Sequence, residues 1–133
     1  MEAYIDSNVF IYAFTNHDEF GEGCRNLLRM VREGKEKAVT SSLAFNEGFF
    51  VISRMRSFDE SIEFAKVLFE TPNLRIANVG LSTVSLAFSL SRKYKLKPND
   101  AVHAAAAIES RCTIFYSHDK DLRRIAEINI KTP

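Results

Sequence analysis

The chain has 133 residues, which is enough to bury a core, and we expect a single domain that spans residues 1–133. With 46% hydrophobic and 26% charged residues, the composition excludes an intrinsically disordered protein, and no apolar run is long enough for a membrane helix. A net charge of +1 excludes a strong overall attraction to nucleic acid, so any such binding depends on a local basic patch.

Strand and helix patterns alternate along the chain. Short apolar runs predict strands over residues 3–6, 37–40, 75–79, 113–117 and 128–131. Apolar residues at helical spacing predict helices over residues 8–14, 18–33, 43–56, 58–70, 81–94, 98–110 and 119–125. Gly34 is placed to end the second helix and Pro98 to open the sixth. This order predicts an α/β fold, a three-layer α/β/α sandwich with a mainly parallel sheet of about five strands.

Three of the predicted helices carry an apolar stripe that we expect to face the core. In helix 18–33 the stripe consists of Phe20, Cys24, Leu27, Leu28 and Val31. In helix 58–70 it consists of Phe58, Ile62, Ala65 and Phe69. In helix 81–94 it consists of Leu81, Val84, Ala87, Phe88 and Tyr94.

The two cysteines, Cys24 and Cys112, form no CxxC pair, and no apolar signal segment opens the sequence. We therefore expect both thiols to be reduced and buried. The same two observations predict a cytoplasmic protein.

Acidic residues follow two of the predicted strands. Asp6 ends the first strand, and ligands of open α/β sheets bind at this carboxyl edge. Asp119 and Asp121 follow strand 113–117 in the same way, so they would lie near Asp6 if the two strands were adjacent and parallel. Taken alone, Asp119 could be only a helix cap.

Two further acids occur near helix starts. Asp100 lies in the first turn of helix 98–110, where it could serve only to complement the helix dipole. Glu47 lies among apolar residues of helix 43–56, where an unpaired acid is costly to bury, although it could also lie at the surface. His103, one turn after Asp100, is expected to pack or hydrogen-bond near these acids, and a catalytic role is open.

Several carboxylates at one edge repel each other unless a cation neutralises them. Mg²⁺ prefers such oxygen ligands, and a carboxylate site of this kind suits metal-assisted hydrolysis of a phosphodiester. Other chemistries fit less well, because the sequence has no glycine-rich phosphate loop and no nucleophile-elbow pattern. His17, His103 and His118 do not form a zinc-ligand pair.

Four short motifs resemble those of the PIN-domain ribonucleases, in particular the VapC-type toxins of toxin–antitoxin pairs. They cover residues 5–9, 42–47, 98–105 and 117–122, in the family's order and at about its spacing. Each motif is weak alone, and four in register are more specific. Ser7 and Asn8 match the polar pair that supports the first aspartate in the family, and Ser117 stands where Thr is more frequent.

The resemblance implies a parallel sheet of about five strands with an acidic pocket, and cleavage of RNA that depends on Mg²⁺ or Mn²⁺. Asp6, Glu47, Asp100 and Asp119 correspond to the acidic quartet of the family, and Asp121 to a frequent fifth acid. Our hypothesis is that Asp6, Asp100 and Asp119 hold the metal, while Glu47 orients a water that attacks the phosphate. Asp121 is a candidate ligand for the metal or for a second ion.

Two surfaces are candidates for RNA and protein partners. The basic residues that could surround the acidic pocket, or simply be solvated, are Arg54, Arg56, Arg92, Lys93, Lys95, Lys97, Lys120, Arg123 and Arg124. The apolar residues that could fill the core, or form a groove between helices 43–56 and 58–70 for an antitoxin, are Phe45, Phe49, Phe50, Ile52, Phe58, Phe64 and Phe69. The resemblance also implies a homodimer that uses the remaining apolar faces.

Three functions are compatible with these observations. The first is the ribonuclease toxin of a toxin–antitoxin pair, and the second is a housekeeping PIN nuclease of RNA processing without an antitoxin. The third is a catalytically inactive PIN scaffold that binds RNA or protein. The intact acidic set counts against the scaffold, which has no need of it.

Overall fold

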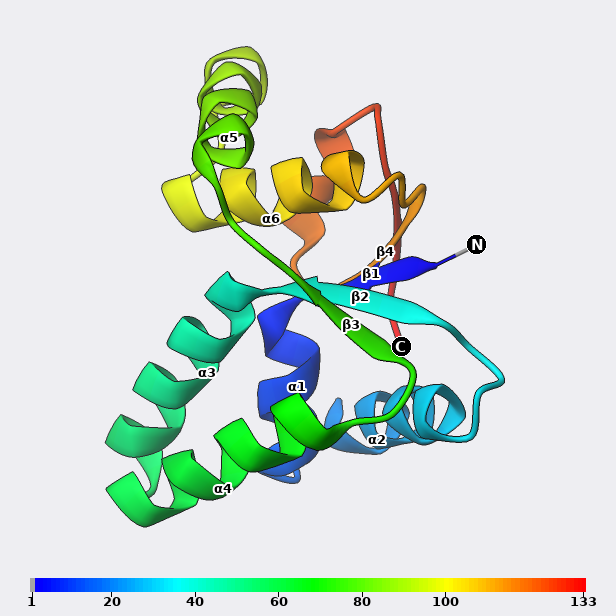
Figure 1. Cartoon of the computed structure of the whole chain (residues 1–133), viewed down its shortest axis with the longest axis vertical. Coiled ribbons are helices and arrows are strands. Elements are labelled where there is room, and N and C mark those ends of the chain that lie inside the picture. The colour runs from blue at the N-terminus through cyan, green and yellow to red at the C-terminus, as the bar shows by residue number, and fades with distance from the viewer. Residues whose placement is uncertain (1) are drawn as a thin grey trace.

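Five strands form one fully parallel sheet in a computed structural model that describes residues 2–133 (Figure 1). The strand order is β3-β2-β1-β4-β5, and every neighbouring pair is parallel. The strands are β1 (Ala3–Ile5), β2 (Ala38–Ser41), β3 (Leu74–Ala77), β4 (Ile114–Tyr116) and β5 (Asn129–Lys131). The predicted parallel sheet of five strands is therefore confirmed.

Helices cover both faces of this sheet. They are α1 (Ser7–Phe14), α2 (Gly21–Arg32), α3 (Ser42–Met55), α4 (Phe58–Glu70), α5 (Leu81–Tyr94), α6 (Pro98–Glu109) and the 3₁₀ helix η1 (Lys120–Arg124). Figure 1 shows α5 and α6 on one side and α1 to α4 on the other. The strand alternation explains the two layers, because Tyr4 joins the core beneath α5 and α6 while Ile5 joins the core beneath α1 to α4. The predicted three-layer sandwich is confirmed.

Several local signals act as expected. Gly34 has a φ of 77° just after α2, a backbone conformation that favours glycine, and Pro98 is the first residue of α6. Helix α2 begins at Gly21 rather than Asp18, because the His17 ring accepts hydrogen bonds from the backbone N–H groups of Glu19 and Phe20. Cys24 and Cys112 are free and buried.

The predicted stripe of α2 is largely confirmed, whereas that of α4 is wrong in phase. Phe58, Ile62 and Phe69 are exposed, and the residues that α4 buries are Ser61, Phe64, Ala65 and Leu68. A side chain at Gly48 of α3 would collide with the ring of Phe64. The missing side chain at this position therefore lets Phe64 enter the core, and this contact sets the rotation of α4.

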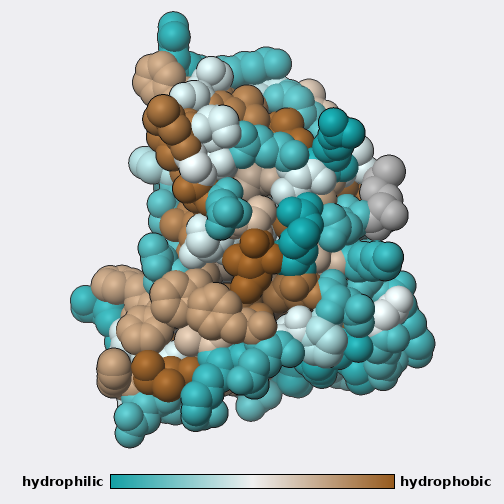
Figure 2. All heavy atoms as spheres, viewed as in Figure 1, coloured by the Kyte–Doolittle hydropathy of each residue, from teal (hydrophilic) through white to brown (hydrophobic). Residues whose placement is uncertain are grey.

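The predicted stripe of α5 is also wrong in phase. Leu81, Val84 and Phe88 are 83%, 49% and 64% exposed, and the buried side chains of α5 are Thr83, Ala87 and Leu90. Small residues face α6, whose four consecutive alanines allow the two helices to approach closely. Figure 2 shows the apolar side chains that result on the surface over α5, and a second group over α3 and α4.

None of the helices in residues 2–133 is both long enough and apolar enough to cross a membrane.

Candidate active site

The strand order brings the predicted acidic residues to one edge of the sheet. Strands β1 and β4 are adjacent and parallel, with Ile5 opposite Tyr116, so Asp6 and Ser117 leave the sheet side by side. Asp6 is the N-cap of α1, Asp119 is the N-cap of η1, and Asp100 lies in the first turn of α6. Glu47 reaches the same place from α3. We call Asp6, Glu47, Asp100 and Asp119 the acidic site.

Asp6 is buried and held by hydrogen bonds on both oxygens. Its Oδ1 accepts from the backbone N–H of Ser7 at 2.7 Å, and its Oδ2 accepts from Ser117 Oγ at 2.7 Å and Asn8 Nδ2 at 3.3 Å. The hydrogen bond from Ser117 to Asp6 ties the ends of β4 and β1 together, and Ser117 Oγ also accepts from the backbone N–H of Asp119 at 2.9 Å. The expected support of Asp6 by Ser7 and Asn8 is present in the structure.

Glu47 is half-buried and also well supplied with donors. Its Oε1 accepts from Ser7 Oγ at 2.9 Å and contacts His103 Nε2, and its Oε2 accepts from Asn99 Nδ2 at 3.0 Å. Burial works to raise the pKa of Glu47, but the hydrogen bonds from His103, Ser7 and Asn99 bring it below its ordinary value. Glu47 is therefore a carboxylate at neutral pH.

His103 lies beneath the acidic site and is only 1% exposed. Its Nε2 contacts Glu47 and lies 3.5 Å from Asp6 Oδ1, and its Nδ1 is 2.7 Å from the Tyr4 hydroxyl, which donates to Ser41 Oγ. Burial works to lower the pKa of His103, but the charge of Asp6 and the contact with Glu47 raise it overall. The sequence indicated that His103 hydrogen-bonds near the site, but it gave no signal for Tyr4 or Ser41.

Asp100 is compensated only in part, by the charge of His103. Among the residues that the structure describes, none hydrogen-bonds to its carboxyl group. Burial, followed by the charges of Asp119 and Asp6, raises the pKa of Asp100 to about 6. A carboxyl group in this position is poorly stabilised as an anion, and a cation nearby would reverse that.

Asp119 is a helix cap, and its role as a metal ligand stays a prediction. Its side chain accepts from the backbone N–H of Asp121 at 2.9 Å, as a helix cap does, and its charge acts on Asp100 within the acidic site. Asp121 is exposed on η1. Its role as a metal ligand stays a prediction.

The donor atoms of the site fit a divalent cation. Asp6 and Glu47 each place one oxygen within 4.8 Å of the other and of His103, and Asp100 and Asp119 add negative charge beside them. Oxygen-rich sites of this kind suit Mg²⁺ or Mn²⁺. The raised pKa of Asp100 agrees with this, because burial and the charges of Asp119 and Asp6 outweigh the charge of His103.

Acidic side chains at the carboxyl edge of a doubly wound parallel sheet define a class of site that is suited to a cation and a phosphate ligand. The sequence profile described as PIN domain matches residues 3–128, which is nearly the whole chain. The chain therefore belongs to the PIN-domain family. A search among curated proteins finds no match.

Solved structures share this fold over almost their full length. VapBC2 from Rickettsia felis, bound to a DNA fragment from its promoter, is similar with a TM-score of 0.79 and 15% identity, over 99% of this chain and 98% of that one. VapC20 from Mycobacterium tuberculosis, a sarcin-ricin loop cleaving toxin, has a TM-score of 0.79 and 13% identity, over 94% and 95%. VapBC-1 from nontypeable Haemophilus influenzae has a TM-score of 0.71 and 18% identity, over 99% and 98%. The fold of the chain is thus that of VapC-type PIN domains, as predicted.

Proposed function

We propose that the protein is a metal-dependent endoribonuclease that hydrolyses RNA phosphodiesters, and that it is the toxin of a toxin–antitoxin pair. The observation that carries the nuclease proposal is the acidic site on a PIN fold, with the charge of Asp100 left unbalanced. A scaffold that only bound RNA would gain nothing from carboxylates that repel each other and the phosphates. The similarity to VapC20 and to VapBC complexes supports the more specific role of a toxin.

The residues of the acidic site divide the chemistry between them. Asp6, Asp100 and Asp119 would hold Mg²⁺ or Mn²⁺, with Asp121 as a further candidate. The bound ion would supply Lewis acidity at the phosphate and lower the pKa of a water. Glu47 stays ionised at neutral pH, so it accepts a hydrogen bond from the attacking water and orients that water toward phosphorus.

RNA must approach this negative site, and basic residues beside it would reduce the repulsion. Lys97 is the N-cap of α6, three residues before Asp100, and Lys120 directly follows Asp119; both are exposed. Two of the other predicted basic residues are engaged elsewhere: Lys93 pairs with Glu127, and Arg56 with Glu60. We therefore expect Lys97 and Lys120 to contribute most to RNA binding.

The proposal is tested by RNA cleavage in Mg²⁺ or Mn²⁺ with the wild type, Asp6→Asn and Asp100→Asn. We expect both variants to lose activity by at least about 100-fold, because each removes a carboxylate that would hold the ion. Glu63→Gln is the matched control, since it neutralises an exposed acid of α4 that pairs with Lys66. Full activity in EDTA, or in both aspartate variants, would refute the proposal.

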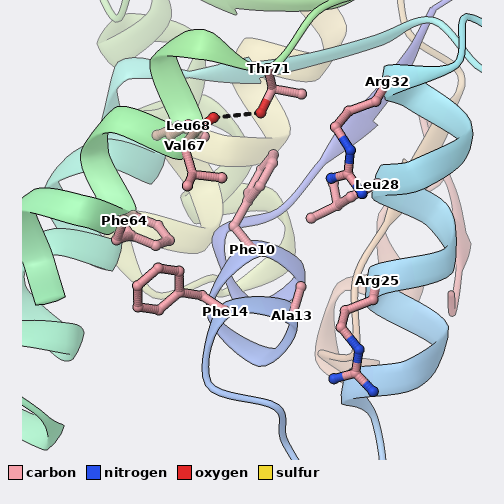
Figure 3. A pocket seen from close by; sticks show the side chains of 10 residues that line it. All are labelled: Phe10, Ala13, Phe14, Arg25, Leu28, Arg32, Phe64, Val67, Leu68 and Thr71. Carbon is pink, nitrogen blue, oxygen red and sulfur yellow. Dashed lines mark hydrogen bonds between the residues drawn. The ribbon is translucent and has the colours of Figure 1, made fainter.

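A groove between three helices supports an antitoxin partner. It lies between α1, α2 and α4, rather than between α3 and α4 as the sequence suggested (Figure 3). The lining residues are Phe10, Ala13, Phe14, Arg25, Leu28, Arg32, Phe64, Val67, Leu68 and Thr71. Of the aromatic residues expected to line a groove, Phe64 lines this one and is largely buried, whereas Phe50, Phe58 and Phe69 are exposed and do not line it.

The chemistry of this groove indicates what an antitoxin segment would present. Its floor and one wall are apolar, while Arg25 and Arg32 of α2 lie along the opposite wall (Figure 3). The two arginines are seven residues apart, which places them about 10 Å apart on one face of the helix. An amphipathic segment with apolar residues flanked by two acids would match this wall.

The partner proposal is tested by co-expression with the product of the neighbouring small open reading frame. Val67→Glu places a charge in the groove on a residue that is 52% exposed, and we expect it to abolish the complex and the rescue of growth. Ile62→Glu is the matched control, because Ile62 is 37% exposed on the same helix and does not line the groove. Equal binding by both variants would exclude the groove, and the absence of any partner would favour the housekeeping nuclease.

The homodimer implied by the family resemblance would use the exposed apolar face of α5. Leu81, Val84 and Phe88 form this face, and Pro98 and Val102 of α6 lie beside it. Sedimentation equilibrium of the wild type and of Phe88→Asp tests this role. A dimer in the wild type and a monomer in the variant are expected, and a monomeric wild type would contradict it.

A further inference from the structure

We infer that His103 is a positioning residue that fixes the Glu47 carboxylate in the acidic site, and that Tyr4 and Ser41 hold its ring in place. The inference rests on the proposed function, because it assigns to Glu47 the orientation of the attacking water. His103 itself would touch neither substrate nor water, because only 1% of it is exposed. Its effect would pass entirely through Glu47.

The ring of His103 is fixed from the side of the sheet. Its Nδ1 lies 2.7 Å from the Tyr4 hydroxyl, and the two rings meet edge to face with centroids 5.8 Å apart. Tyr4 cannot move away, since it is fully buried in β1 and stacks on Phe115 of β4 at 4.9 Å. Its hydroxyl donates to Ser41 Oγ at the end of β2, at 2.9 Å. Three neighbouring strands thus contribute to the position of one imidazole.

The other ring nitrogen of His103, Nε2, faces the carboxylates of Glu47 and Asp6. Nε2 contacts Glu47 Oε1 and lies 3.5 Å from Asp6 Oδ1, and both of these oxygens are acceptors. Nε2 is therefore the donor in its contact with Glu47. A donor between the two carboxylates also reduces their repulsion, which allows Glu47 to stay close to Asp6.

No other donor to Glu47 has the same rigidity. Asn99 is exposed at the start of α6, and the Ser7 hydroxyl is shared, because it also lies 3.4 Å from Asp6 Oδ1. His103 is buried and bonded at both nitrogens, so its ring has one orientation. Glu47 extends from α3, and His103 connects it through Tyr4 to β1, the strand that precedes Asp6. A group that orients a water requires this kind of preorganisation.

The experiment compares His103→Leu with His103→Gln, whose amide can place a donor near the position of Nε2. With RNA and Mn²⁺, we expect kcat to fall by up to about 100-fold in His103→Leu, as for a catalytic group displaced by about 1 Å. We expect KM and the Mn²⁺ dissociation constant to change by less than about threefold, and His103→Gln to recover most of kcat. Tyr4→Phe, which keeps the ring and loses the hydroxyl, should give a smaller loss of kcat.

A control separates this role from a loss of stability. Ser61→Ala removes a buried hydroxyl on α4, where it donates to the carbonyl of Phe58, far from the acidic site in the chain. It should lower the thermal midpoint without lowering kcat at 25 °C. If His103→Leu does not fold, the kcat of Tyr4→Phe still decides, since equality with the wild type would overturn the inference.

Two further readouts do not depend on cleavage. Crystal structures should show the Glu47 carboxylate displaced in His103→Leu and restored in His103→Gln; an unmoved carboxylate would overturn the inference. Electron spin echo spectra of bound Mn²⁺ should show no coupling to a histidine nitrogen. A coupling that disappears in His103→Leu would mean that His103 is a metal ligand, and it would overturn the inference. A wild type that binds Mn²⁺ but leaves RNA intact would refute the proposed function, and the displacement of Glu47 would still test the position.

Discussion

Two parts of the acidic site are built differently: Asp6 and Glu47 form the first half, and Asp100 is the second. Asp6 and Glu47 accept hydrogen bonds on every carboxylate oxygen, from Ser7, Asn8, Asn99 and Ser117, and both contact His103. Asp100 has no hydrogen-bond partner among residues 2–133, and burial and its acidic neighbours raise its pKa to about 6. The protein itself stabilises the charge of the first half. It leaves the charge of the second half for a cation to stabilise.

The largest expected effect on stability belongs to the half that is already satisfied. Asp6→Asn replaces an acceptor oxygen by an NH₂ group, so at least one of its donors, such as Ser117 Oγ, loses its acceptor. We expect the free energy of unfolding without metal to fall by about 2 kcal/mol, within the range for a buried hydrogen bond to a charged group. Urea unfolding in EDTA measures it.

The control for this comparison is Asp121→Asn on the exposed face of η1. Its unfolding free energy should stay within about 0.5 kcal/mol of the wild type, as for most surface substitutions. An equal loss in both variants would mean that the hydrogen bonds around Asp6 add nothing specific.

The second prediction concerns the other half and the pH. Protons compete with Mn²⁺ for Asp100, whose pKa is about 6 without the ion. We expect the affinity for Mn²⁺ to fall by about tenfold from pH 8 to pH 5, because most Asp100 groups are then protonated. Calorimetric titration at several pH values measures this slope, and Asp100→Asn should flatten it. A wild-type affinity that is constant down to pH 5 would contradict the unbalanced charge of Asp100.

The satisfied half of the site was the more predictable one, for a physical reason. Parallel strands bring their carboxyl ends to one edge, so the strand pattern placed Asp6 and Asp119 together on the condition that β1 and β4 are neighbours, which the structure shows. The polar neighbours Ser7 and Asn8 lie next to Asp6 in the chain. The unbalanced state of Asp100 could not be predicted, because it depends on burial and on distances between charges from four different segments.

Contacts between distant segments were beyond the sequence pattern. The Tyr4 hydroxyl meets His103, 99 residues away, and nothing in a strand of three residues distinguishes a tyrosine that packs from one that also bonds to a histidine. The rotations of α4 and α5 were wrong for a related reason. Counting apolar residues favours the face with large side chains, whereas Gly48 and the alanines of α6 select faces that fit closely.

The smallest predicted effect separates the two halves most clearly, because its sign is opposite to that of Asp6→Asn. Asp100→Asn removes a charge that the protein without metal stabilises poorly, so this variant should be more stable than the wild type at pH 8. A rise in pKa from 3.8 to about 6 corresponds to at most about 3 kcal/mol, and solvent screening at this half-buried group reduces the expected gain to about 1 kcal/mol.

The direction of this effect follows from proton linkage. The folded protein binds a proton at Asp100 more tightly than the unfolded chain, so stability from this group is present below pH 4 and is lost as the pH rises through about 6. The gain of Asp100→Asn should therefore vanish at pH 4, and saturating Mn²⁺ at pH 8 should reverse it, because only the wild type gains the full binding energy of the ion. Thermal unfolding of the wild type and the variant at pH 8, at pH 4, and at pH 8 with saturating Mn²⁺ measures these differences. A variant less stable than the wild type at pH 8 without metal would show that Asp100 is stabilised by the fold, and the distinction between the two halves would fail.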